Sequence, residues 1–181
     1  MMLRLATTAM FIFAFGSSSV QAANFTVTCT AGNTTLAFNS YDVLAGTAVT
    51  LPLGSITVSC TSTHSSPVTV NYTLTLATSP ARRLTSGGNT LNYDIYTDSN
   101  YSVQWGTTGT CTAGSNNNAG NVICGSFQVP AKSSASQSKT YYGKIPGGPA
   151  VDVPVGSYTQ VGLAVTLTYS CNPAPTGGGT C

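Results

Sequence analysis

The sequence predicts an all-β protein folded as a disulfide-linked β-sandwich. Apolar and polar residues alternate with a period of two along several short segments, which is the pattern of half-buried strands. The polar residues are largely Thr, Ser, Asn and Gly, which suit strands and turns better than helices. No segment carries apolar residues at helical spacing over two turns. Many short strands separated by turns are typical of a sandwich.

Five segments show the alternation, and in each of them one face is apolar and the other is rich in Thr or Ser. In residues 68–76, for example, Val, Tyr and Leu alternate with Thr and Asn. The predicted strands lie at residues 25–29, 56–61, 68–76, 91–97 and 161–169. Stretches rich in Gly, Pro or Asn separate them at residues 86–89, 112–121 and 146–149.

The chain is long enough for one domain and very poor in charge. Its 181 residues include six Lys and Arg, four Asp, one His and no Glu, so that only 6% are charged. An ordinary soluble domain has about 25%. This composition excludes a coiled coil and a charged disordered tail. It also leaves no basic stripe, so we expect no nucleic-acid partner.

The first residues have the features of a secretory signal peptide. Arg4 precedes an apolar run at residues 5–15, which is too short to span a bilayer, and Val20-Gln21-Ala22 resembles a signal peptidase site. We expect cleavage after Ala22 rather than a membrane anchor, and no transmembrane segment in the mature chain. The expected organisation is a signal peptide (1–22), one folded domain (23–171) and a Gly- and Pro-rich tail (172–181).

Six cysteines follow the signal peptide. An even count in an exported chain predicts disulfides, although six cysteines allow fifteen pairings and the sequence does not choose among them. We favour pairs that are close in the sequence, each worth roughly 3 kcal/mol. These are Cys29–Cys60, Cys111–Cys124 and Cys171–Cys181. No CxxC occurs and His64 is the sole imidazole, so we expect no metal site.

Side chains suited to catalysis are scarce. The carboxylates of the expected mature chain are Asp42, Asp94, Asp98 and Asp152. Asp94 and Asp98 share one face of a predicted strand, but turn and edge polarity is the better interpretation. His64 lies in a predicted turn, and no nucleophile elbow or phosphate-binding loop is present. We therefore expect no catalytic residue, no cofactor and no enzymatic activity.

Two further groups have both a functional and a structural interpretation. Trp105, Tyr101 and Tyr96 could form a platform on which a sugar stacks, but Trp105 before Gly106 is more typical of a core anchor. Arg82-Arg83 could contact an anionic surface, but we favour a solvated hairpin end.

Several short motifs follow one another in a distinctive order. They are LAFNSYD (36–42), ITVSCT (56–61), RRL (82–84) with LNYDIYTD (91–98), Trp105-Gly106, YGKIP (142–146) and the segment from Gly156 to Tyr169. Together they cover residues 29–170 and resemble the signatures of the spore coat protein U domain family. Asn39 and Gln160 depart from the family pattern, and the loop 111–124 resembles an insertion relative to that pattern.

The resemblance implies a fold, partners and a site. The family includes subunits of archaic chaperone–usher pili, which have an immunoglobulin-like sandwich lacking one strand, and related secreted coat proteins. It implies a Cys29–Cys60 bridge, and a strand supplied first by a periplasmic chaperone and then, at an outer-membrane usher, by another pilus subunit. The candidate residues of the acceptor groove are Phe25, Val27, Val161, Leu163, Val165, Leu167 and Tyr169.

The leading hypothesis is therefore a fimbrial or coat subunit, exported through the periplasm to a surface fimbrium or secreted. Only residues 23–28 precede Cys29 in the expected mature chain, so it can accept a strand but has little to donate. This favours the pilus tip, with adhesion or biofilm formation through the loop 111–124. The alternative is a free-standing secreted sandwich that binds glycans or coats a surface. A hydrolase is disfavoured by the single His and the absence of Glu.

Overall fold

The computed structural model describes residues 24–32, 48–76, 82–86, 88–147, 159–160 and 164–181, and within these it is all-β. The described part of the chain holds no helix that could cross a membrane. The strands, in order, are β1 (Val27–Ala31), β2 (Val49–Ser62), β3 (Val68–Leu76), β4 (Arg83–Ser86), β5 (Asn89–Asn92), β6 (Asp94–Tyr96), β7 (Ile123–Val129), β8 (Ser134–Ile145), β9 (Thr159–Gln160) and β10 (Val165–Asn172).

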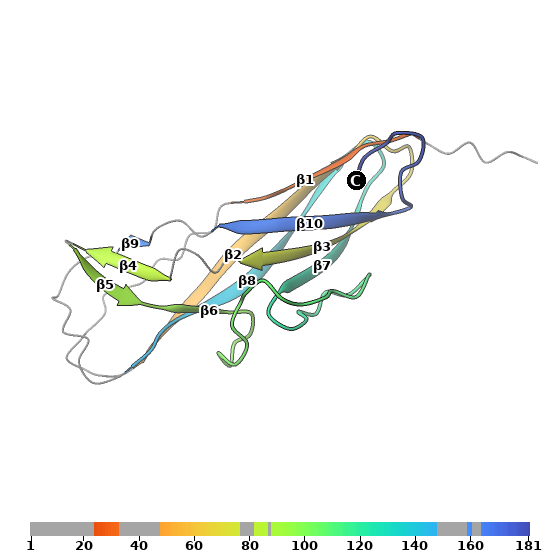
Figure 1. The fold of residues 1–181 in the computed structure, drawn as a ribbon. Coiled ribbons are helices and arrows are strands. Elements are labelled where there is room, and N and C mark those ends of the chain that lie inside the picture. Colours follow the sequence, from red (N-terminus) through yellow and green to blue (C-terminus); the bar gives the residue numbers. More distant parts are fainter. Residues whose placement is uncertain (1–23, 33–47, 77–81, 87, 148–158, 161–163) are drawn as a thin grey trace, which may run out of the picture.

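Two antiparallel sheets form the layers of a β-sandwich (Figure 1). One sheet has the strand order β1-β2-β8-β6, and the other has the order β10-β3-β7. A small third sheet, β5-β4-β9, lies beyond one end of the two layers (Figure 1). The fold class predicted from the sequence is confirmed.

The core lies between the two large sheets and follows from the alternation of side chains. In β3 every second residue from Val68 to Leu76 is buried, and the residues between them are only partly covered. Burying one such side chain stabilises the fold by about 1.5–3 kcal/mol. Trp105 is fully buried, packs against Tyr141 at 5.4 Å between ring centroids, and donates from Nε1 to the Leu74 carbonyl at 3.0 Å. It is thus the predicted core anchor.

The alternating segments of the sequence became strands, but two long strands were not predicted. Alternation led to β1, β2, β3, the β5–β6 region and β10, whereas residues 161–163 lie outside the described part. The long strands that were missed are β7 and β8, and the short strands β4 and β9 were not predicted either. In the first half of β8 only Ala135 is apolar, and Gln137 and Lys139 take the other inward positions, so no period-two pattern marks it.

The three disulfides join the pairs that are close in the sequence: Cys29–Cys60, Cys111–Cys124 and Cys171–Cys181. The first links neighbouring residues of β1 and β2. The third joins β10 to the last residue of the chain. Because of it the tail folds back, and Figure 1 shows the C-terminus beside β1.

Candidate functional site

The most unusual feature of the sandwich is a side on which neither sheet is extended. β10 pairs with β3 along one edge, and β1 pairs with β2. No other named strand of the described residues pairs with the second edge of either one. The end of β10 and the start of β1 lie next to each other, because the Tyr169 hydroxyl donates to the Val27 carbonyl at 3.3 Å. We call the space between these two edges the β1–β10 opening.

The side chains along the opening are apolar but incompletely covered. Val165, Leu167 and Tyr169 of β10 point toward the core and are only partly buried, as are Cys29 and Ala31 of β1. The inward residues of the adjacent β3 are all fully buried. The core is therefore closed under β3 and left partly uncovered at β10.

The groove residues predicted from the sequence do not all lie in the same environment. Val165, Leu167 and Tyr169 line the opening. Phe25 and Val27 are 4% and 1% exposed and belong to the chain's own core, so they lie below the opening rather than along it. Val161 and Leu163 are outside the described residues. Sequence reasoning did not name Cys29 and Ala31 as lining residues, although both continue the period-two pattern of β1.

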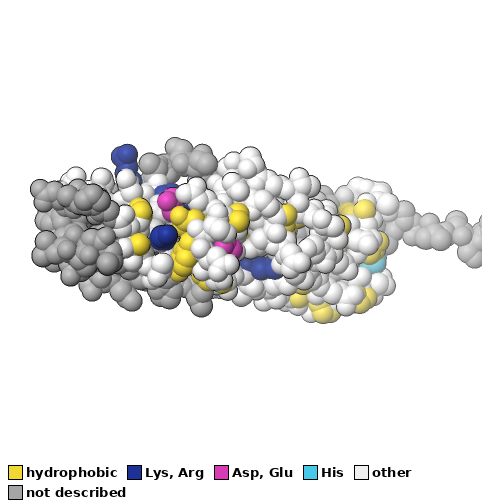
Figure 2. Space-filling model, turned by 90° about the horizontal axis from the view of Figure 1, so that it is seen from below, with side chains coloured by type: hydrophobic (Ala, Val, Ile, Leu, Met, Phe, Trp, Pro, Cys, Tyr) yellow, Lys and Arg dark blue, Asp and Glu magenta, His cyan; other side chains and the backbone are white. Residues whose placement is uncertain are grey.

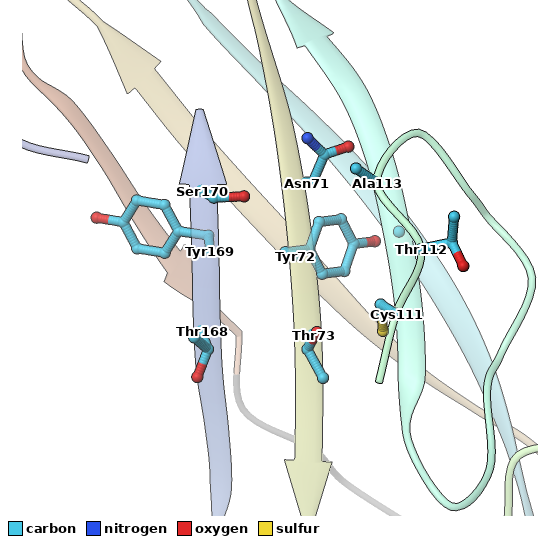
Figure 3. Close-up of a pocket in the computed structure, with 10 residues that line it drawn as sticks. Asn71, Tyr72, Thr73, Cys111, Thr112, Ala113, Thr168, Tyr169 and Ser170 are labelled. Atoms are coloured by element: carbon cyan, nitrogen blue, oxygen red, sulfur yellow. The ribbon is translucent and has the colours of Figure 1, made fainter. Parts of the chain in front are cut away.

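A hollow of about 160 Å³ lies next to the opening, on the outer face of the β10-β3-β7 sheet. Figure 3 shows β3 and β10 side by side, with the loop that carries Cys111, Thr112 and Ala113 alongside β3. Hydroxyl and amide groups of Asn71, Thr73, Thr168 and Ser170 border the hollow. Its lining is mixed, because Tyr72, Cys111 and Ala113 also face it.

The loop 111–124 is fastened to the sheet by its own Asn side chains. The Asn116 Oδ1 accepts from the Ser126 amide at 2.9 Å, and its carbonyl accepts from Lys139 Nζ at 2.8 Å. The Asn118 amide group donates to the Thr97 carbonyl at 2.8 Å. Asn71 Oδ1 accepts from the Gly114 amide at 2.7 Å. The loop therefore lies against the sandwich, with two of its Asn side chains turned toward the protein.

Three partly exposed tyrosines form a cluster on the outer face near β6. The rings of Tyr96 and Tyr142 lie 5.6 and 6.1 Å from that of Tyr101, both edge to face, and Lys144 Nζ is 5.8 Å from the Tyr101 centroid. Figure 2 looks at the side on which β6 lies and shows hydrophobic side chains between charged ones. Of the predicted stacking platform, Tyr96 and Tyr101 are together here, whereas Trp105 is in the core.

Asp98 shapes the loop that holds Tyr101. Its carboxylate accepts from the Val103 amide at 2.7 Å, from the Ser102 hydroxyl at 2.8 Å and from the Asn100 amide at 3.1 Å. Desolvation raises the Asp98 pKa, but these hydrogen bonds outweigh it and hold the pKa below its usual value. The loop keeps Tyr101 at a positive φ of 56°. Asp98 is thus a loop cap, and its carboxylate is fully engaged.

Arg82 is also structural, which corrects the expectation of a solvated hairpin end. Its side chain is 14% exposed, forms an ion pair with Asp94 at 3.8 Å, and donates to the carbonyls of Trp105 and Ile95. The ring of the loop residue His64 packs against that of Phe25, with 4.2 Å between the ring centroids. No group of three His, Cys, Asp or Glu side chains in the described ranges is arranged to hold a metal.

Comparison with known proteins bears on this arrangement. The model of the Spore Coat Protein U domain matches residues 14–168, which is most of the chain. No curated protein matches the sequence significantly. The family is a structural one, associated with chaperone–usher fimbrial subunits and surface coats rather than with catalysis. A match over this length shows that the chain belongs to the Spore Coat Protein U domain family.

Proposed function

We propose that this protein is a fimbrial subunit that is completed by a strand from another molecule, added at the β1–β10 opening. A periplasmic chaperone supplies the strand first, and a second subunit replaces it at the outer-membrane usher. The observation that carries the proposal is the partly exposed apolar row of Val165, Leu167 and Tyr169 on a strand whose outer edge is unpaired among the described residues.

The physical reason is the cost of leaving this edge uncovered. A free strand edge presents unpaired N–H and C=O groups, and an apolar row beside it promotes aggregation. A strand laid along β10 pairs those groups and places alternate side chains over the uncovered core. The same surface that endangers the isolated subunit therefore provides the energy for assembly.

The test is to produce the exported protein with and without a periplasmic chaperone of a chaperone–usher system from the same organism. We expect the subunit alone to be degraded or to aggregate, and the pair to purify as a soluble one-to-one complex. A stable soluble monomer obtained without any helper would contradict the proposal. A second test is to delete the gene and examine the cells for surface fibres. Loss of the fibres, and their return when the intact gene is restored, would support a surface role for the subunit.

A tip position is the finer part of the proposal. Phe25 and Val27 are buried in the chain's own core, so the segment around them is already used by this domain. If the signal peptide is removed after Ala22, little chain remains to enter a neighbour's opening. Such a subunit would end the fibre and present its loops for adhesion and biofilm formation. Incorporation of its N-terminal segment into another subunit, detected by cross-linking, would refute the tip position.

Glycan binding is the second candidate function, and the tyrosine cluster favours it. Partly exposed aromatic rings with Lys144 beside them offer stacking surfaces and a charged donor to a sugar. Binding to a glycan array should be lost in Tyr101→Ala and retained in Asn117→Ala, an exposed loop control. Binding that is equal in both variants would remove this candidate.

A further inference from the structure

The C-terminal tail occupies one end of the β1–β10 opening. Thr180 forms a parallel bridge with Thr26. The Val27 amide donates to the Thr180 carbonyl at 3.0 Å, and the Thr180 amide donates to the Phe25 carbonyl at 3.2 Å. Since the other edge of β1 is paired with β2, these bonds fill the edge that faces the opening. At this end β1 already has a partner.

The contact between the tail and β1 is close and specific. A Cβ atom at Gly179 would lie 2.3 Å from the Phe25 carbonyl oxygen, so only glycine allows the tail backbone to approach this far. The Cys171–Cys181 disulfide fixes the tail to β10 itself. The tail is thus held by a covalent bond on one sheet and by backbone hydrogen bonds on the other.

We propose that this tail is a fixed stop, which remains in place when a strand is added and limits the pairing of the added strand to β10 residues up to Tyr169. The inference rests on the proposed acceptor function and specifies its site. Tyr169 marks the limit because its hydroxyl crosses the opening to the Val27 carbonyl. Figure 3 shows the Tyr169 side chain extending away from β3, on the side where β1 lies.

The stop also defines the strand that fits. β10 runs toward the Val27–Tyr169 contact and β1 runs away from it, so counting back along both strands opposes Cys29 to Leu167 and Ala31 to Val165. The side chains on the β1 side are small there. They leave room for two bulky apolar side chains, two residues apart, on the added strand. Near Tyr169 the ring fills the space, and the added strand must be small or end.

Amide hydrogen exchange on the full mature protein tests the stop. The probe is a pair of synthetic peptides of alternating valine and threonine, one of about five residues and one of about nine. We expect alternate β10 amides from Val165 to Tyr169 to gain protection with either peptide, while the amides of Val27 and Thr180 keep theirs. We also expect the outward amides of β10 beyond Tyr169 to gain no protection with the longer peptide, since the tail blocks pairing there.

Gly179→Ala removes the tail from β1 while the disulfide stays intact, because the new Cβ cannot fit against Phe25. In this variant the long peptide should also protect outward β10 amides beyond Tyr169, and should bind about tenfold better than it binds the native chain, which is the worth of one or two net hydrogen bonds. Gly32→Ala is the control, since its Cβ would meet only an ordinary contact at 3.5 Å. It should behave as the native chain does.

The two possible failures can be told apart. Loss of protection at Val27 and Thr180 when β10 gains it would show that the strand displaces the tail, and would overturn the stop alone. Protection of outward β10 amides beyond Tyr169 by the long peptide in the native protein would do the same. If no peptide protects β10 in any variant, the acceptor function falls, and the stop falls with it.

Discussion

The two long sides of the sandwich are closed in different ways. On the side of β6 and β7, the chain covers its own edges: the Trp105 amide donates to the Ile95 carbonyl at 2.7 Å, and the Leu76 amide donates to the Gly106 carbonyl at 2.9 Å. On the side of β1 and β10, the described chain contributes only the end of the tail, and apolar residues stay partly exposed. One side was built for stability, and we propose that the other was kept for a partner.

The residue types on the two sides match this division. The covered side uses Trp, Asn and Gly residues of the loop 97–122. Their side chains or their closely packed backbone form hydrogen bonds with backbone groups of the chain. The open side uses Val, Leu, Tyr and Thr in alternation, and among the described residues only the Tyr169 hydroxyl of this row bonds to a backbone group, the Val27 carbonyl. A self-sufficient edge thus needs specific hydrogen bonds, whereas an edge meant for another strand needs only its period-two pattern.

The largest effect is expected on the covered side. Trp105→Ala removes a fully buried side chain together with its hydrogen bond to Leu74, and should destabilise the protein by about 3–5 kcal/mol. Thermal denaturation followed by circular dichroism measures the change. Thr107→Ala, an exposed neighbour, is the control. A change below about 1 kcal/mol in Trp105→Ala would mean that the covered side does not carry the stability assigned to it.

The open side should respond in assembly more than in stability. Leu167→Ser exchanges a partly exposed apolar side chain for a polar one at the centre of the opening. We expect recovery of the chaperone complex to fall at least about tenfold, because an apolar contact over the core is lost. Thr168→Ser, on the outer face of the same strand, should leave the complex intact. Equal recovery of the chaperone complex in both variants would show that assembly does not depend on the apolar side chains of the opening.

Alkaline pH should destabilise the covered side by ionising Tyr141, which packs on Trp105. Burial raises the Tyr141 pKa from 10.0 to about 12 and the Tyr72 pKa further. Since the folded state holds the neutral phenol, its stability is kept below the unfolded pKa and is lost as the pH rises through the folded one. The final rise in tyrosinate absorbance, which comes from the buried tyrosines, should therefore appear together with unfolding between about pH 10 and 12. Complete ionisation of tyrosine in a still folded protein would contradict this.

The smallest effect concerns the Asp98 loop. Its lowered pKa means that the carboxylate stabilises the loop above the unfolded pKa, and that this contribution disappears as the pH falls through the folded pKa. We expect the NMR amide signals of Ser102 and Val103 to shift on acidification, while those of β3 do not. Asp98→Asn should produce the acid-like shifts at neutral pH. Unchanged signals in both experiments would show that the hydrogen bonds to Asp98 do not hold the loop.

Much of the covered side could not have been read from the sequence. β8 has few inward apolar residues in its first half, where Gln137 instead accepts a hydrogen bond from Tyr72 at 2.7 Å. Asn116 and Asn118 in a Gly- and Asn-rich stretch predicted only a loop, because partners such as the Thr97 carbonyl and Lys139 come beside them only after folding. Arg82 was interpreted as solvated for the same reason: Asp94 and Trp105 meet it only after folding.

By itself the sequence determined that the protein is all-β and which residues of β3 and β10 face the core, whereas the pairing of its cysteines was only favoured until the structure showed it. Alternation is a local property, and a period of two fixes the buried face wherever a strand forms. Tertiary structure alone decided that β10 lies at an edge, that Phe25 is buried while Leu167 is not, and that Thr180 pairs beside Thr26. Exposure of an apolar residue depends on which strands flank it, and those neighbours come from distant parts of the chain.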